Sequence, residues 1–221
     1  MFRFFRRKPH TRSVIELWNS PRSKALDYYE KAESEEWLRH FWQDGSPFRG
    51  LFDRLDLSRV LDLACGQGRH TAKFIERAGH VTLFDTSAVA MDFCRRRFAD
   101  RDNLTYIVSP TGTDLNPIAD DSMTSVFSYD AMVHFEDRCV FGYLPEIARV
   151  LRAGGLALLH ISAYDKHIGR DFRANPDWRA HMSLVQFRAG AAAAGLSIES
   201  LQTIPWSTAE HTDALVMLAK S

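Results

Sequence analysis

The hydrophobic pattern predicts strands that alternate with helices from residue 58 onward. Short apolar runs bounded by turn residues are typical of buried strands, and apolar residues at helical spacing separate most of them. The predicted strands are Val60–Ala64, His80–Phe84, Leu104–Val108, Thr124–Tyr129, Leu156–Ile161, Ser197–Ile204 and Ala214–Ala219. The predicted helices are about Arg69–Ala78, Ser87–Ala99, Cys139–Leu151 and Ser183–Ala194. Because such alternation builds βαβ units, we expect an α/β fold with a doubly wound, mostly parallel sheet.

The first 57 residues have a different pattern, helical and aromatic, with no strand. Trp37, Leu38, Phe41 and Trp42 fall on one face of a predicted helix over Glu33–Asp44. We therefore divide the chain into a helical N-terminal extension or cap (1–57) and a main domain (58–221). Within the main domain, residues 163–180 lack periodicity and are rich in arginine, histidine and aromatic residues, which predicts a lid-like segment or a solvated loop.

Composition narrows the class of protein. The chain has 221 residues, 45% of them hydrophobic, which is enough to bury a core. Lys plus Arg and Asp plus Glu both number 28, so the basic excess of a general nucleic-acid binder is absent. The apolar runs are far shorter than the ~20 residues that a membrane span needs. The three cysteines show no zinc or disulfide spacing, a pattern typical of reduced thiols in a cytoplasmic protein.

The extreme N-terminus is basic and aromatic. Residues 1–8 read MFRFFRRK and lack the apolar core of a signal peptide. Two interpretations stay open, a frayed solvated terminus and a weak contact with an anionic surface. The sequence makes no prediction of the oligomeric state.

A glycine turn follows the first predicted strand and opens a helix. Gly66 and Gly68 let the backbone approach a ligand closely, and the helix N-terminus offers unpaired amides. The next strand ends in Asp85, close to the spacing of about 20 residues at which an acid reaches a ribose diol. Gly-x-Gly alone is a weak signal, but together with Asp85 it predicts a nucleoside-type ligand.

The choice of nucleoside cofactor depends on two residues. Thr71 stands where a dinucleotide fingerprint has its third glycine, and Asp62 ends the first strand beneath the turn. A carboxylate there repels a pyrophosphate but suits a cation. S-adenosylmethionine, with its sulfonium, ammonium and ribose, is therefore the predicted cofactor.

Three segments together resemble the class I S-adenosylmethionine-dependent methyltransferases. They are residues 60–69 (VLDLACGQGR), 84–87 (FDTS) and 148–156 (ARVLRAGGL). The sequence departs from the family pattern at Ala64, where many members have glycine, and at Ala153, where proline is usual. The two residues at the first position are both small, so the departure is not expected to matter.

The resemblance implies a seven-stranded sheet whose last strand is antiparallel. It also implies that Asp62, Gly66 and Gly68 flank the methionine moiety, that Asp85 holds the ribose and that residues 112–115 line the adenine. The full set of residues expected to bind the cofactor is Asp62, Ala64, Cys65, Gly66, Gly68, Asp85, Thr86, Thr113, Asp114, Leu115 and Tyr129.

The loop after the fourth predicted strand is expected to hold the chemistry. The resemblance places residues 128–136 beside the transferred methyl group. A hydroxyl acceptor benefits from a base, and histidine suits that task near pH 7. His134 is the predicted base, with Asp130 orienting it or shaping the site. The alternatives are that His134 packs or caps a helix, that Asp130 is a buried turn residue, and that His160 is a second base or a packing residue.

No metal site is predicted, because Asp130 and His134 lack a third ligand at convincing spacing. Trp206 and the aromatic residues of 163–180 suit stacking on a sugar or ring face, while their arginines suit carboxylates or phosphates. A weaker resemblance points to enzymes that methylate sugar hydroxyls. The predicted function is methyl transfer from S-adenosylmethionine to a small-molecule or glycan acceptor, most readily at a hydroxyl oxygen.

Two other functions remain open at this point. A nicotinamide-dependent oxidoreductase would use the same glycine turn and Asp85, and a non-catalytic subunit would bind the cofactor without acceptor chemistry. The segment from Tyr129 to Met132 lacks the Asn/Asp-Pro-Pro-Tyr/Phe loop of amine methylation on nucleic acids. We therefore expect no nucleic-acid partner.

Overall fold

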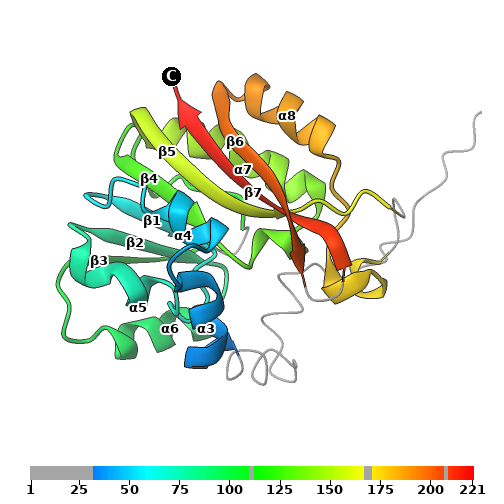
Figure 1. The fold of residues 1–221 in the computed structure, drawn as a ribbon. Helices are drawn as coiled ribbons and strands as arrows, with labels where there is room; N and C mark the ends of the chain where they lie inside the picture. The colour runs from blue at the N-terminus through cyan, green and yellow to red at the C-terminus, as the bar shows by residue number, and fades with distance from the viewer. Residues whose placement is uncertain (1–31, 110–111, 167–170, 207–208) are drawn as a thin grey trace, which may run out of the picture.

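The computed structural model describes residues 32–109, 112–166, 171–206 and 209–221, arranged around one seven-stranded sheet (Figure 1). The strand order is β3-β2-β1-β4-β5-β7-β6. The strands are β1 (Val60–Leu63), β2 (Val81–Asp85), β3 (Leu104–Val108), β4 (Met123–Ser128), β5 (Leu151–Ser162), β6 (Leu196–Trp206) and β7 (Ala209–Lys220). Every neighbouring pair is parallel except those of β7, which runs antiparallel to β5 and β6. The predicted α/β fold is confirmed, including the single antiparallel strand.

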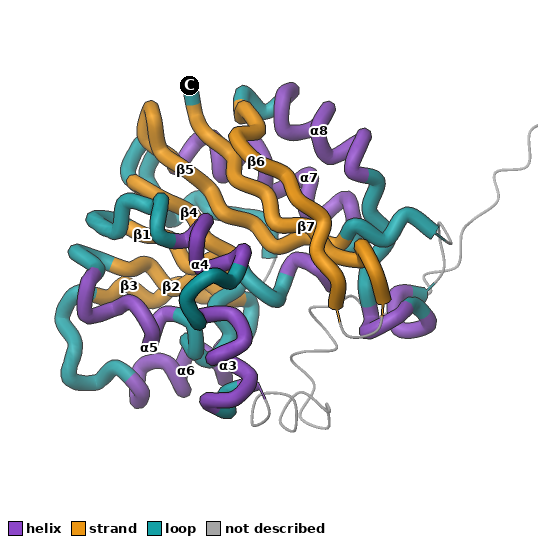
Figure 2. Tube along the Cα trace, in the orientation of Figure 1, coloured by secondary structure: helices purple, strands orange, loops and turns teal. Residues whose placement is uncertain are grey.

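Helices cover both faces of the sheet (Figure 2). The α-helices are α3 (Glu35–Trp42), α4 (Pro47–Phe52), α5 (Thr71–Phe74), α6 (Ala88–Arg97), α7 (Asp137–Val150) and α8 (Leu184–Ala193). The 3₁₀ turns are η1 (Ile75–Arg77), η2 (Met132–His134), η3 (Phe172–Ala174) and η4 (Pro176–Trp178). Helices α7 and α8 pack on one face around residues such as Val126, and α3 to α6 pack on the other around Phe127. Adjacent residues of β4 thus face different cores, as pleating requires.

Several element boundaries differ from the prediction; β7, for example, begins at Ala209 rather than Ala214, and two others lie beside the predicted motifs. The helix after the glycine turn ends at Phe74, whose φ of −132° leaves the helical region, and η1 completes the segment. Strand β5 begins at Leu151 rather than Leu156, because Gly154 adopts a φ of +72° and forms an irregularity in the strand. The register with β4 accordingly jumps from Leu151 to Leu156.

Helix α4 was not predicted. The sequence Gly45-Ser46-Pro47 ends α3, but the same residues also start the next helix. The Ser46 hydroxyl accepts a hydrogen bond from the Arg49 amide at 3.0 Å, and Pro47 occupies the first turn. Proline at the first helical position costs no hydrogen bond, since that amide has no helical partner.

The described part of the N-terminal region shares a core with the sheet. Phe41, Phe48, Phe52 and Leu55 belong to the same apolar cluster as Phe127 of β4. The predicted change at residue 57 is thus a change from helix to sheet within one continuous core. Residues 1–31, which include the basic aromatic start, lie outside the described residues, and so do residues 167–170 of the lid-like segment.

Two further observations bear on location. No helix within the described ranges is long and apolar enough to cross a bilayer. Cys65, Cys94 and Cys139 are all free thiols. A cytoplasmic location stays a prediction.

The strand order predicts where a ligand binds along the sheet. The order of strands reverses between β1 and β4, since β2 and β3 lie on one side and β5 on the other. In open α/β sheets the crevice at such a switch point, beyond the carboxyl ends of the strands, is where ligands bind.

Candidate active site

A cavity of about 1140 Å³, counting its open mouth, lies beyond the carboxyl ends of β1, β2 and β4. Ten residues that the sequence singled out line it: Asp62, Ala64, Cys65, Gly66, Asp85, Thr86, Thr113, Tyr129, Asp130 and His134. We call the part formed by Asp62, Gly66 and Asp85 the glycine-loop end, and the part formed by Arg69, Asp130 and His134 the His134 end.

Gly68 is a predicted site residue that the structure places elsewhere. Its φ is +74°, and a Cβ atom there would lie 2.7 Å from Cε2 of Phe98 and 3.2 Å from Sγ of Cys94. Gly68 does not line the cavity. Its small size is required because residues of and next to α6 press against the turn.

Asp114 and Leu115 are also placed away from the cavity. The Asp114 carboxylate accepts the Asn116 amide at 2.8 Å and forms a local turn. Leu115 is fully buried in the core under α7, and its amide donates to Glu146 at 3.2 Å. Of the described residues in the loop after β3, Gly112 and Thr113 line the cavity.

Some lining residues were missed by the sequence analysis. Cys139 and Tyr143 of α7 face the cavity together. They are one helical turn apart, so helical spacing was the signal that could have found them. Arg69 and His70 line the cavity where the glycine turn enters α5.

The backbone of the glycine turn is held in left-handed conformations. Ala64 has a φ of +61° and Gly66 a φ of +54°. This conformation costs an L-residue roughly 1–2 kcal/mol and costs glycine almost nothing. The departure at Ala64 therefore does matter, because backbone conformation rather than side-chain size favours glycine there.

The glycine-loop end holds two buried carboxylates. Asp62 is 3% exposed, and its Oδ2 accepts the Thr71 hydroxyl at 2.5 Å. Asp85 accepts the Gly66 amide and the Ser87 amide, each at 2.8 Å. Within the described residues, neither carboxylate forms an ion pair with an arginine or lysine.

Burial controls the protonation of both acids. The pKa of Asp62 is raised to about 7, mainly by desolvation; the Thr71 hydrogen bond opposes this, and the nearby Asp85 charge adds to it. Desolvation also raises the pKa of Asp85, although amide hydrogen bonds oppose it. This end of the cavity is therefore electrostatically suited to a cation, which would restore the ionised forms.

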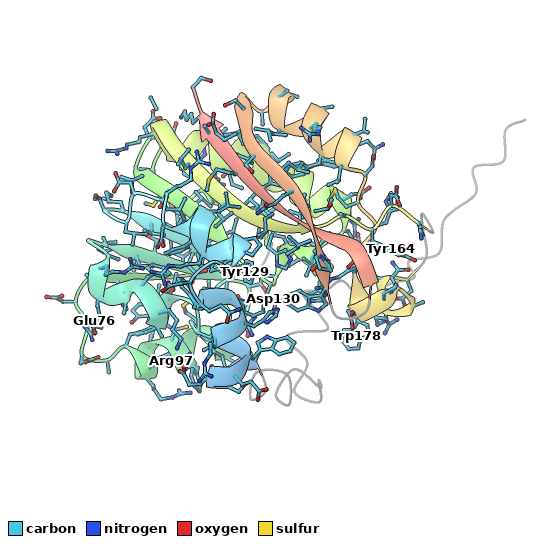
Figure 3. The ribbon with its side chains drawn as sticks, in the orientation of Figure 1. Glu76, Arg97, Tyr129, Asp130, Tyr164 and Trp178 are labelled. Carbon is cyan, nitrogen blue, oxygen red and sulfur yellow. The ribbon has the colours of Figure 1, made fainter. Side chains whose placement is uncertain are left out.

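Asp130 at the His134 end is paired. Its carboxylate receives Nη2 of Arg69 at 2.6 Å, and both side chains are almost fully buried. Its backbone has a φ of +54°, which is uncommon for a non-glycine residue and concentrates at functional sites. Figure 3 shows Asp130 and Tyr129 side by side near the middle of the molecule.

His134 lies on η2 and lines the cavity. Its Nδ1 is 2.9 Å from the carbonyl oxygen of Trp178. A carbonyl can only accept, so Nδ1 carries the proton and the lone pair of the neutral ring is on Nε2. Burial, helped by the positive charge of Arg179, lowers the pKa of His134. The ring is therefore neutral at pH 7, as a general base must be.

His160 is not a second base at the cavity. It is fully buried, its Nδ1 accepts the Asp130 amide at 3.2 Å, and its Nε2 donates to Asp213 at 2.9 Å. Both ring nitrogens are therefore used inside the protein, and His160 does not line the cavity. The packing interpretation of this strand-end histidine is the one that the geometry supports.

Arg179 was expected to bind an anionic ligand, but it forms an ion pair with Asp213 of β7. Its guanidinium donates two hydrogen bonds of 2.7 Å to that carboxylate and is 2% exposed. It also lies 4.6 Å from the ring centre of Trp206, which stacks on Phe41 of α3 at 5.8 Å. Trp206 thus covers a buried ion pair rather than an open substrate surface.

Part of the chain matches a known protein family. Residues 60–155 match the family model described as a methyltransferase domain. The chain is 34% identical over 111 residues, 48% of its length, to the methyltransferase GfsG of Streptomyces halstedii. It is 37% identical over 98 residues, 44% of its length, to a demethylmenaquinone methyltransferase of Clavibacter sepedonicus. These matches cover 39% and 38% of the two relatives, so the chain spans about two fifths of their length.

A solved structure extends the likeness to nearly the whole chain. The geranyl diphosphate C-methyltransferase of Streptomyces coelicolor, solved with Mg²⁺, geranyl diphosphate and S-adenosylhomocysteine, aligns with a TM-score of 0.67. The alignment covers 93% of this chain and 85% of that one at 16% identity, which shows the fold alone. Residues 60–155 thus match a methyltransferase domain, and the three sequence motifs resemble those of the class I S-adenosylmethionine-dependent methyltransferases.

Proposed function

We propose that this chain transfers a methyl group from S-adenosylmethionine to a hydroxyl oxygen of a small-molecule or glycan acceptor. The observation that carries the cofactor is the pair of buried carboxylates at the glycine-loop end. Asp62 and Asp85 form no ion pair with a described cationic side chain, and burial raises the pKa of each. A ligand that brings an ammonium and a sulfonium relieves this cost, whereas a pyrophosphate increases it.

Each residue at this end would contact a different part of the cofactor. Asp62 would face its cationic groups, and Asp85 would accept ribose hydroxyls with the lone pairs that the Gly66 and Ser87 amides leave. When bound, S-adenosylmethionine supplies an activated methyl group. The nicotinamide-dependent alternative is disfavoured, because a dinucleotide would place its pyrophosphate near these two carboxylates.

His134 carries the proposal of an oxygen acceptor. Its Nε2 has the lone pair, and burial and Arg179 lower the pKa of the ring, so a neutral base is present at pH 7. His134 Nε2 would accept the hydroxyl proton of the acceptor, whose oxygen would take the methyl group as the carbon–sulfur bond breaks and S-adenosylhomocysteine leaves. The imidazolium would then release the proton to solvent. Asp130, already paired with Arg69, shapes the site without acting as a second base.

Proton-linked calorimetry tests the cofactor. At pH 6 most Asp62 is protonated, so binding of S-adenosylmethionine should release close to one proton, and this release should vanish by pH 9. Binding enthalpies measured at each pH in two buffers that both hold that pH but differ in ionisation enthalpy give the number of protons released. Asp62→Asn should abolish the release, and NAD should show no comparable affinity. A wild-type protein that binds the cofactor without releasing a proton would contradict the role of Asp62.

A labelled-methyl screen of hydroxyl acceptors tests turnover. The non-catalytic alternative predicts binding of S-adenosylmethionine and no labelled product with any acceptor class. Product on an amine or thiol, with none on hydroxyls, would overturn the proposed oxygen chemistry and leave the cofactor assignment intact.

A further inference from the structure

A group of buried polar side chains is linked, through hydrogen bonds to backbone groups, to the two residues predicted to act on the acceptor. Asp213 of β7 is its junction. Oδ2 of Asp213 accepts both Nε2 of His160 at 2.9 Å and Nη2 of Arg179 at 2.7 Å, and Oδ1 accepts Nε of Arg179 at 2.7 Å. Asp213 and His160 are fully buried, and Arg179 is 2% exposed.

One branch of the network reaches Asp130. Nδ1 of His160 accepts the Asp130 backbone amide at 3.2 Å, and the Asp130 carboxylate pairs with Arg69. This branch is fixed at the point where the chain adopts its left-handed turn after β4. It also sets the tautomer of His160, because an amide only donates, so the ring proton must be on Nε2.

The other branch reaches His134. Arg179 donates from Nη1 to the Asp177 carbonyl at 3.0 Å, and the Ala180 amide donates to the Val133 carbonyl at 2.9 Å. The Ala180–Val133 bond joins this segment to η2, and the Arg179–Asp177 bond ties the guanidinium to the backbone next to Trp178. Between them lies Trp178, whose carbonyl accepts Nδ1 of His134. Trp178 lies on the segment beyond the β6–β7 hairpin, away from Asp130 (Figure 3).

The charges of this network balance. It contains two arginines and two aspartates, Arg69 with Asp130 and Arg179 with Asp213, and two histidine rings that need no net charge. A buried ion pair rarely adds much stability over an apolar pair, so its retention calls for another reason. Fixing the conformation of neighbouring groups is such a reason.

We propose that Asp213 and Arg179 are positioning residues for His134. They hold the Trp178 carbonyl where it fixes the His134 ring as the Nδ1–H tautomer, with its lone pair on Nε2. This rests on the proposed function, in which Nε2 takes the acceptor proton. A ring with its proton on Nε2 could not act as that base, so loss of the carbonyl would remove catalysis without touching the cofactor.

Long-range ¹H–¹⁵N spectra of the histidine-labelled protein test this without an acceptor or a methyl donor. In the wild type, His134 should show the Nδ1–H pattern and His160 the Nε2–H pattern. Arg179→Met should convert His134 to an averaged or Nε2–H pattern and leave His160 unchanged. The affinity for S-adenosylhomocysteine should change less than about twofold, because neither Arg179 nor Asp213 lines the cavity.

The matched control is Arg173→Met. Arg173 lies in the same segment and pairs with Asp171, but that pair is exposed. It should leave both histidine patterns unchanged. If Arg179→Met does not fold, the double variant Arg179→Met/Asp213→Asn removes both charges, so that no charge is left buried without a partner. Arg179→Lys keeps the positive charge but loses the two-pronged hydrogen bond to Asp213. We expect it to restore the Nδ1–H pattern of His134 in part.

Turnover gives a second readout. Arg179→Met should lower kcat by on the order of 10²-fold, the loss expected from a misplaced catalytic group, with little change in KM. An unaltered His134 pattern in folded Arg179→Met would overturn the positioning role. An altered pattern together with full activity of His134→Ala would keep the positioning role and overturn the proposed base.

Discussion

The two ends of the cavity hold buried carboxylates in opposite settings. At the glycine-loop end, Asp62 and Asp85 form no ion pair with a described side chain, and burial raises their pKa values. At the His134 end, Asp130 is paired with Arg69. Behind it, burial tends to raise the pKa of Asp213, but hydrogen bonds from His160 and Arg179 outweigh this and lower it. The carboxylates of the glycine-loop end lack a paired cation among the described side chains, whereas those at and behind the His134 end are paired with arginines.

The two settings suit different roles under the proposed function. A buried acid without a counter-charge destabilises the ligand-free protein, and a bound cation would remove that cost. A buried pair that is already compensated gains nothing from a ligand but fixes geometry. We therefore expect the glycine-loop end to supply binding energy and the His134 end to supply positioning.

His134→Ala tests most directly whether the His134 end supplies the general base. Loss of a general base should lower kcat for a hydroxyl acceptor by ~10²–10⁴ and leave cofactor affinity nearly unchanged. The wild-type rate should rise with pH through a pKa below 6.5, because burial and Arg179 lower the pKa of this histidine. Single-turnover rates between pH 4.5 and 8.5 (a range of roughly two units about that pKa) measure both effects. Equal rates in the variant would remove His134 from the mechanism.

Arg69→Met should reveal how firmly the His134 end is built. It leaves Asp130 charged, buried and without its arginine, which costs about 3–5 kcal/mol in free energy of unfolding. Arg95→Met is the control, because it breaks an exposed pair with Asp92 and should cost well under ~1 kcal/mol. Urea unfolding of both variants gives the difference. Equal losses would mean that the Arg69 pair contributes no more than a surface pair.

Asp62→Asn should act in the opposite direction at the glycine-loop end. The folded pKa of about 7 lies above the unfolded value of ~3.9, so the folded state holds its proton more tightly. Stability from this group is complete below pH ~4 and is lost as the pH rises to about 7. The neutral variant should therefore gain roughly 2–4 kcal/mol over the wild type at pH 8 and almost nothing at pH 4. Unfolding measured without ligand at both pH values tests this, and a pH-independent difference would contradict it.

Asp85→Ala sharpens the picture of the same end. It removes the carboxylate that would accept ribose hydroxyls, which should weaken S-adenosylhomocysteine binding by about 1.5–3 kcal/mol. Calorimetry measures the loss, with the exposed Asp92→Ala as the control. Unchanged affinity would move the ribose away from Asp85.

Ala64→Gly is the smallest expected effect. Relief of the left-handed conformation should stabilise the fold by about 1 kcal/mol, less the entropy that glycine adds to the unfolded chain. Ala78 has a φ of −87°, so Ala78→Gly relieves no strain in the folded state. It adds the same entropy to the unfolded chain and should destabilise the fold by ~0.5–1 kcal/mol. Thermal unfolding compares the two, and a loss at both positions would show that Ala64 is unstrained.

The sequence predicted the two ends unequally for a physical reason. Asp62, Gly66 and Asp85 lie directly after strands, and a strand-turn-helix unit places such residues without help from distant parts of the chain. Gly68 fits the same motif, but its role is set by Phe98, a contact that no local pattern encodes. Local spacing therefore predicted residues that line the cavity, whereas Gly68 lies outside that lining.

The His134 end depends on contacts between distant residues. Arg179, in the segment before α8, forms an ion pair with Asp213 of β7. The polar sequence around Arg179 had instead indicated that it binds the substrate. Nothing in the spacing of these residues indicates a buried pair, because the antiparallel insertion of β7 between β5 and β6 brings them together. His134 and Asp130 could be proposed from the sequence, but their supports could not.

The position of Asp213 also sets an order of events during synthesis. A ribosome adds the methyltransferase-domain match at 60–155 before it adds His160, Arg179 and Asp213. Domains generally fold as units, and the sheet of this one is complete only when β7 lies between β5 and β6. The Trp178 carbonyl therefore has no Arg179–Asp213 anchor until β7 has been made. Under the proposed function, His134 gains its orientation only then, and methyl transfer waits for the last strand of the sheet.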